Sequence, residues 1–90
     1  MIEIVKVLKI DKLGGFRLRL YFSDGAAGER DFTDVIGEGG VMVEPLQEQK
    51  YFARVFLQLG TLTWPNGFEL DSIALHDEMM AAGALRRSVA

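Results

Sequence analysis

The sequence contains no cysteine, and it has only two prolines and one histidine among its 90 residues. The absence of cysteine excludes a disulfide-stabilised scaffold and any zinc site built on thiolates. A single histidine cannot supply the several imidazole ligands that a typical metal site uses. We therefore expect a chain that folds around a hydrophobic core alone and holds neither a metal nor another cofactor.

Long hydrophobic runs are also missing. No segment approaches the roughly 20 apolar residues needed to cross a bilayer, and the first ten residues, MIEIVKVLKI, lack the layout of a signal peptide. With 49% hydrophobic and 26% charged residues, the composition is typical of a soluble globular domain. We expect one cytoplasmic α+β domain over residues 1–83 and a C-terminal tail over residues 84–90 that frays.

The small net charge of −3 hides an uneven distribution. Residues 1–23 sum to +3, and residues 24–48 sum to −6. One interpretation is a basic strand paired with an acidic neighbour, which would set Glu29 near Arg17 and Arg19. The other is an acidic face that docks a basic partner. Direct binding to nucleic acid is disfavoured, because the acidic middle of the chain would repel phosphate.

Residue patterns predict a small antiparallel sheet of hairpins with two helices. Alternating or β-branched residues indicate strands over residues 2–10, 16–22, 28–32, 53–59 and 61–64. Asp24 and Gly25 are typical of a tight hairpin turn. Pro45 favours a short middle helix over residues 45–52. Asp71 as N-cap and Gly83 as the terminating residue predict a C-terminal helix over residues 72–82.

Few residues suggest catalysis. The glycine-rich segment 37–40 lacks the Gly-Lys-Ser/Thr of a phosphate loop. His76 has no second histidine or cysteine to join it, so we expect a solvated residue on the C-terminal helix. Carboxylates around Asp24, Asp31 or Asp34 leave a small carboxylate-based enzyme as the least favoured alternative. We assign no catalytic, cofactor-binding or metal-binding residue.

Surface contacts are the better hypothesis for two features. Trp64 beside a Pro-Asn-Gly turn is either a core aromatic or part of a docking surface, where tryptophan is enriched. Met79 and Met80 are adjacent on a helix and point about 100° apart, so at least one of them is expected to meet a partner. The predicted partner-binding residues are Trp64, Asn66, Met79 and Met80, with Glu38 and Glu44 as steering charges.

Several stretches resemble a known family. They include LRLYFSDG at 18–25, EPL at 44–46, YFARV at 51–55 and GTLTWPNG at 60–67. The sequence is similar over about residues 2–76 to the bacterial domain-of-unknown-function family 2442, with an NE-type N-terminal-domain-like fold. The resemblance implies an α+β fold and no established activity. Some relatives continue into a helix-turn-helix domain, and others lie beside a second small protein. This chain has Phe68-Glu69 where relatives commonly have Asp.

Together these observations favour a non-enzymatic protein-binding or assembly module. We expect a homo-oligomer that also binds a small protein partner, with no direct contact to nucleic acid or membrane. The alternative is a regulatory subunit that acts on nucleic acid only through a partner protein or domain, as an antitoxin does.

Overall fold

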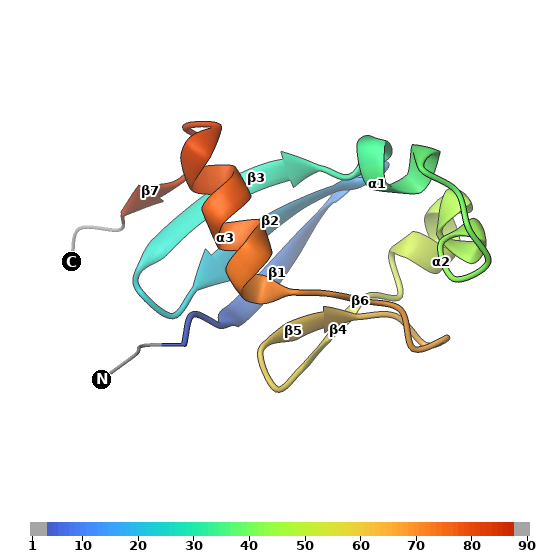
Figure 1. The fold of residues 1–90 in the computed structure, drawn as a ribbon, viewed down its shortest axis with the longest axis horizontal. Helices are drawn as coiled ribbons and strands as arrows, with labels where there is room; N and C mark the ends of the chain where they lie inside the picture. Colours follow the sequence, from blue (N-terminus) through green and yellow to red (C-terminus); the bar gives the residue numbers. More distant parts are fainter. Residues whose placement is uncertain (1–3, 88–90) are drawn as a thin grey trace.

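Two antiparallel sheets organise the chain. The computed structural model describes residues 4–87. The main sheet contains β1 (Val7–Gly14), β2 (Arg17–Phe22), β3 (Ala26–Asp31) and β7 (Arg86–Arg87), in the order β1-β2-β3-β7 (Figure 1). The small sheet contains β4 (Phe56–Gln58), β5 (Thr61–Thr63) and β6 (Glu69–Leu70), in the order β4-β5-β6. The predicted α+β class is confirmed.

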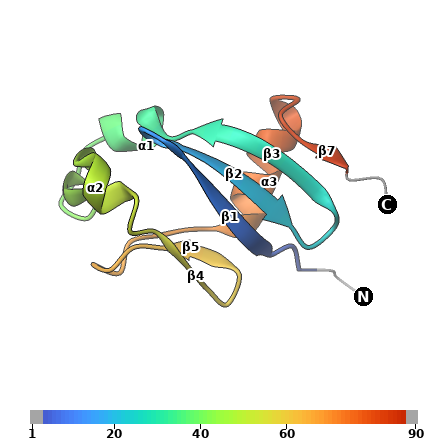
Figure 2. The same cartoon turned by 180° about the vertical axis from the view of Figure 1, so that it is seen from behind.

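The helices cover one side of the main sheet and one end of the molecule. The longest is α3 (Ser72–Ala81), which crosses one face of the main sheet (Figure 1). Three short elements gather at the other end: α1 (Thr33–Gly37), the 3₁₀ helix η1 (Glu44–Gln47) and α2 (Gln49–Phe52). Figure 2 shows the opposite face of the main sheet toward the viewer, with α3 behind it. None of the helices within residues 4–87 is long and apolar enough to cross a membrane.

The alternation of residues in β2 places that strand. Leu18, Leu20 and Phe22 are buried on one face of the strand. Arg17, Arg19 and Tyr21 lie on the other face. The predicted cross-strand ion pairs are confirmed, because Arg17 Nη2 lies 2.8 Å from a Glu29 carboxylate oxygen and Arg19 binds the other oxygen. Two arginines of the basic segment therefore pair with one glutamate of the acidic segment across the β2–β3 hairpin.

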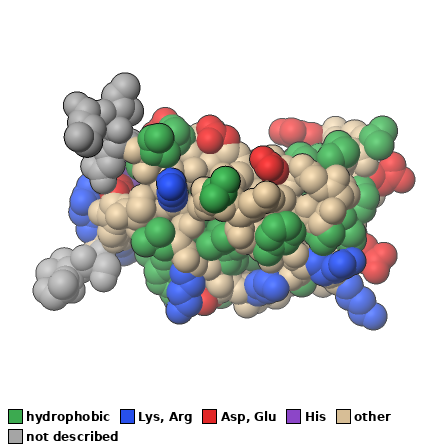
Figure 3. Space-filling model, turned by 90° about the horizontal axis from the view of Figure 1, so that it is seen from below, with side chains coloured by type: hydrophobic (Ala, Val, Ile, Leu, Met, Phe, Trp, Pro, Cys, Tyr) green, Lys and Arg blue, Asp and Glu red, His purple; other side chains and the backbone are tan. Residues whose placement is uncertain are grey.

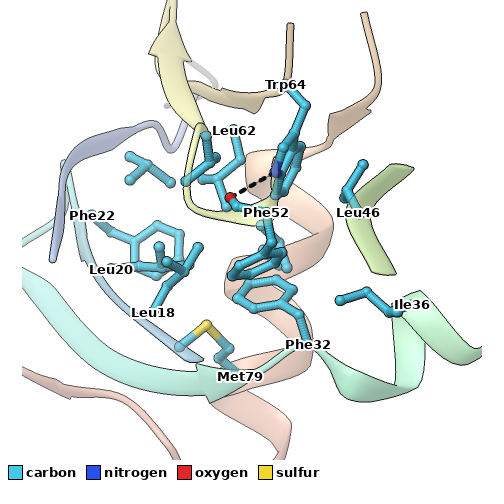
Figure 4. Close-up of a cluster of buried hydrophobic side chains, with 13 residues drawn as sticks. Leu18, Leu20, Phe22, Phe32, Ile36, Leu46, Phe52, Leu62, Trp64 and Met79 are labelled. Carbon is cyan, nitrogen blue, oxygen red and sulfur yellow. Dashed lines mark hydrogen bonds between the residues drawn. The ribbon is translucent and has the colours of Figure 1, made fainter. Parts of the chain in front are cut away.

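The core joins the two sheets and the helices through aromatic rings (Figure 4). Trp64 is fully buried, and its indole Nε1–H donates to the Phe52 carbonyl oxygen over 2.9 Å. The Phe52 ring lies 5.7 Å from the Trp64 ring and 5.8 Å from Phe32, centre to centre. These contacts connect β5, α2 and the end of β3, so one cluster holds all parts of the domain.

The predicted element boundaries were partly wrong. The middle helix is split into η1 and α2, since Glu48 adopts an extended backbone between them. The strand expected over residues 53–59 shortens to β4, because Ala53 and Arg54 continue a turn after α2. The prediction for α3 is confirmed: the Asp71 carboxylate accepts from the N–H groups of Ile73 and Ala74.

The expected frayed tail does not include residues 84–87. Ala84 and Leu85 pack against the core, and β7 pairs with Ala26 and Ala27 of β3. Gly28 makes this return possible, because a Cβ at this position would lie only 2.2 Å from the Ala84 carbonyl oxygen. Residues 88–90, the rest of the predicted tail, lie outside the described part of the chain.

Replacing Gly28 by alanine is expected to displace the segment that leads into β7. The added methyl group meets backbone rather than a flexible side chain, so the clash costs about 1–3 kcal/mol of unfolding free energy. Urea denaturation measures the loss. Gly37→Ala is the matched control, since a Cβ there meets nothing within 4 Å. Equal stability of the two variants would contradict the close approach.

Candidate functional site

Trp64 and Asn66, both predicted to bind a partner, each have a structural role, and only Trp64 is fully buried. Trp64 has no exposed surface, so it cannot contact another molecule in the folded chain. Asn66 ties together two loops: its Nδ2 donates to the Met42 carbonyl oxygen over 2.9 Å, and its Oδ1 accepts from Phe68 N–H over 3.1 Å. The Trp turn is therefore a core-anchored loop, and its prediction as a docking surface is corrected for Trp64.

The other four predicted partner-binding residues, Met79, Met80, Glu38 and Glu44, do not come together in one site. Met79 is buried in the core, which corrects its predicted surface role, whereas Met80 is 53% exposed. Glu38 and Glu44 are both exposed at the end of the molecule that carries α1 and η1. Met80 lies on α3, which crosses the sheet away from that end (Figure 1). Only Met80, Glu38 and Glu44 of this group are available to a partner.

His76 is not solvated as the sequence predicted. It is 7% exposed, and its Nε2 lies 2.7 Å from Oδ2 of Asp24 in the β2–β3 turn. Its ring packs edge-to-face on Phe22, with ring centres 5.0 Å apart. The neighbouring Arg87 donates to the Asp24 carbonyl oxygen over 3.2 Å. This cluster joins α3, the hairpin turn and β7.

The environment of Asp24 favours its charged form. Burial of the carboxyl group opposes ionisation, but the hydrogen bond from Ala26 N–H and the contact with His76 outweigh it. The pKa of Asp24 therefore lies below its ordinary value. Within residues 4–87, the two serines beside this pair are engaged elsewhere: Ser23 accepts from Lys6 N–H, and Ser72 donates to the Val5 carbonyl oxygen. The Asp24–His76 pair thus joins the β2–β3 turn to α3, and we call this hydrogen-bonded pair the Asp24–His76 clasp.

A hollow of about 430 Å³ lies between β3, α1 and α3. Arg30 dominates it: the guanidinium group donates to Asp34 over 3.1 Å and also binds Glu78 of α3. Met79 and Ala82 form its apolar floor. Arg30 is paired with the carboxylates on both sides, but Glu29 and Asp31 also line the hollow, so its lining carries more acidic than basic side chains. Elsewhere in residues 4–87, no three histidine, aspartate or glutamate side chains converge to hold a metal ion.

The outer side of β1 carries exposed apolar side chains. Strand β1 pairs with β2 and forms one edge of the main sheet. On its other side, Val7 N–H donates to the Gly60 carbonyl oxygen over 2.9 Å, which brings the β4–β5 turn against the start of the strand. Leu8, Leu13 and Leu59 are exposed here. We call residues 8–13 together with Leu59 and Gly60 the β1 edge surface.

The hydrophobic character of the surface extends beyond this edge. Figure 3 shows hydrophobic side chains spread over the face seen from below, with lysine and arginine side chains along its lower border. Exposed residues of the small sheet include Phe56 and Leu59.

Comparison with known protein families matches residues 7–79 to a family described as "Protein of unknown function (DUF2442)". The chain belongs to this family. The match covers most of the sequence and confirms the resemblance seen in its motifs. Comparisons with curated proteins and with solved structures return no match.

In this DUF2442 domain, the matched span begins at the first residue of β1 and ends at Met79 within α3. It therefore contains the whole β1 edge surface, the Asp24–His76 clasp and the Trp64 core. Strand β7 and its Arg87 contact to Asp24 lie beyond the match.

Sequence reasoning missed the Asp24–His76 clasp although a signal was present. The buried residues of α3 are Ser72, Leu75, His76 and Met79, which follow the i, i+3, i+4, i+7 spacing of one helix face. Ile73 lies off this face and is 44% exposed. His76 thus belongs to the buried stripe by its spacing, but its partner, 52 residues earlier in the chain, has no counterpart in any local pattern.

Asp24→Asn is expected to lower the unfolding free energy at pH 7 by about 1–3 kcal/mol, the usual contribution of a hydrogen bond to a charged group. The lowered pKa of Asp24 means that this contribution is complete above the carboxyl's unfolded pKa of about 4 and disappears as the pH falls through the folded value. Urea denaturation of both proteins between pH 7 and pH 2.5 measures the difference.

The control is Asp77→Asn, because Asp77 is next to His76 but 78% of its side chain is exposed. Its effect on stability is expected to stay within about 0.5 kcal/mol. A difference between the native chain and Asp24→Asn that stays constant down to pH 2.5 would show that the charge of Asp24 makes no contribution.

Proposed function

We propose that this DUF2442 domain is a non-enzymatic protein-binding module that assembles with copies of itself through the β1 edge surface. The proposal is supported chiefly by Leu59, which is 88% exposed and has a φ of 53°. A large apolar side chain is rare in this left-handed backbone conformation, which asparagine and glycine adopt most easily.

The turn that contains Leu59 explains why the choice of residue is informative. Leu59 and Gly60 both have positive φ and connect β4 to β5 as a two-residue hairpin loop. Such loops favour Asn-Gly, because asparagine tolerates the first position. Leucine raises the energy of the folded monomer here and buries no surface of its own. Contact with another protein surface would bury this apolar side chain and offset the cost of its strained backbone conformation.

The acidic side chains give less support to an enzyme. The hydrogen bonds from Thr33 to Asp31 lower the pKa of that carboxyl group. Burial of Asp34 opposes its ionisation, but its hydrogen bonds with Arg30 outweigh burial and lower its pKa as well. A carboxyl group that serves as general acid needs a raised pKa. These residues fit structural pairing better than acid–base catalysis.

The basic residues give less support to direct binding of nucleic acid. Arg17 and Arg19 both bind Glu29, and Lys9 lies 3.8 Å from Asp11. Because these three basic residues pair with carboxylates on the same face, they offer less free positive charge to phosphates. A protein partner, which offers charges of both signs, suits this face better. We place the module in the cytoplasm, with which a cysteine-free chain is compatible.

Leu59→Asn tests the proposal because it should make the monomer more stable and, at the same time, weaken its self-assembly. Asparagine relieves the left-handed strain, so the unfolding free energy of the monomer is expected to rise by about 0.5–1 kcal/mol. Loss of the apolar side chain is expected to lower the fraction of oligomer. Light scattering on a size-exclusion column over a range of concentrations measures the mass.

Val41→Asn is the matched control, because Val41 is 87% exposed but lies between α1 and η1, apart from the small sheet. It is expected to leave the mass distribution unchanged. A native chain that is monomeric at every concentration would reject self-assembly. An oligomer that Leu59→Asn leaves intact would reject the role of this surface.

A further inference from the structure

The open side of β1 can be identified from the hydrogen bonds around it. Phe32 N–H donates to the Phe16 carbonyl oxygen over 2.8 Å, so the main-chain groups of Phe16 point toward β3. In an antiparallel strand this direction alternates, and Arg19 and Tyr21 therefore point toward β1. Ser23 agrees, because its N–H donates to the Lys6 carbonyl oxygen over 2.7 Å.

The same alternation applies to β1. Lys9 and Asp11 lie opposite Tyr21 and Arg19 and turn their main-chain groups toward β2. Ile10 and Lys12 consequently turn theirs toward the open side. Val7 N–H also points there, after the irregularity at residue 8, and Gly60 accepts from it. In the described part of the chain, Ile10 and Lys12 have no main-chain partner on that side.

We infer that two copies join through β1 as antiparallel strands, with Ile10 opposite Ile10 of the second copy and Lys9 opposite Asp11 of the second copy. This inference rests on the proposed self-assembly and specifies its register. Two Ile10 residues that face each other with outward main-chain groups form a pair of N–H to C=O hydrogen bonds. The two main sheets then continue as one sheet across the interface.

Charge selects this register from its neighbours. Lys9 and Asp11 form an opposite-charge pair on each side of the two-fold axis, which stabilises strand pairing. A shift by two residues in one direction places Asp11 directly opposite its own copy, and a shift in the other direction does the same to Lys9. Both arrangements are unfavourable, since like charges directly opposite repel. A shift by one residue sets outward groups against inward ones and forms no ladder.

Residues next to the paired segment set its length and add a further contact between the two copies. Gly60 occupies the open side of Val7, so the paired segment ends at Leu8 of one copy and Lys12 of the other. Leu13, which is 36% exposed, then comes to the Leu59–Gly60 turn of the second copy. This contact supplies an apolar partner for Leu59. Isolated lysines on an edge strand discourage association, whereas the Lys-Ile-Asp order of β1 permits it in one register.

Engineered cysteines test the register directly, since the native chain contains none. Lys9→Cys and Asp11→Cys are prepared separately and mixed before mild oxidation. Opposite residues of this type have Cα atoms about 4.5 Å apart, which suits a disulfide. A covalent dimer is expected in the mixture and absent from either variant alone, as seen by electrophoresis without reductant. Circular dichroism checks that both variants fold.

The possible results separate the register from the proposed assembly. A covalent dimer of Asp11→Cys alone overturns the register in favour of one shifted by two residues. Absence of any covalent dimer, when the native chain has a dimeric mass, overturns pairing through β1 but not self-assembly. A monomeric native chain overturns both. Val41→Cys is the control for random collision, and cross-linking of it to the same extent as the mixture overturns the inference.

Discussion

The hydrogen bond from the Trp64 indole to the Phe52 carbonyl oxygen holds the two halves of the domain together. Trp64 directly follows β5, and Phe52 ends α2, so one buried contact fixes the small sheet against the helical end. The ring of Phe52 then reaches Phe16 and Phe32 beside the main sheet. A chain of 90 residues has few buried side chains, so its largest aromatic residues carry a large share of the apolar area that folding removes from water.

Polar contacts fix the remaining long element, α3, against the sheet. Asp24 binds His76 near the middle of the helix, and Arg30 binds Glu78 half a turn later. Both partners come from the β2–β3 hairpin, and they hold the helix at two points along its length. Since a buried charge is costly when it has no partner, these pairings tie the four residues to the fold.

The features that point to function are those that do not contribute to the stability of the single folded chain. Trp64, Asn66 and His76, which looked informative in the sequence, all have structural explanations. Leu59 has none within the chain, because its side chain is exposed and its backbone conformation favours another residue. It lies beside edge strand β1, in which the outward main-chain groups of Ile10 and Lys12 have no main-chain partner within residues 4–87. The strained turn and the unpaired edge together make self-assembly through β1 the function that the geometry supports best.

Patterns of neighbouring residues were enough to predict part of the local structure. Alternation in β2, the Asp24-Gly25 turn, the Asp71 cap and the charges of Arg17, Arg19 and Glu29 all depend on neighbours within a hairpin or a single helix turn. They were therefore predictable, as was the family.

Tertiary structure decided the rest, because it depends on groups distant in sequence. The burial of Trp64 and Met79, the pairing of His76 with Asp24 and the return of residues 84–87 to β3 require elements from both ends of the chain to meet. A pattern of residue types records which face of an element is apolar. It does not record which other element covers that face. For this reason the sequence alone could not show whether Leu59 and β1 are buried in the core or exposed to a second copy of the chain.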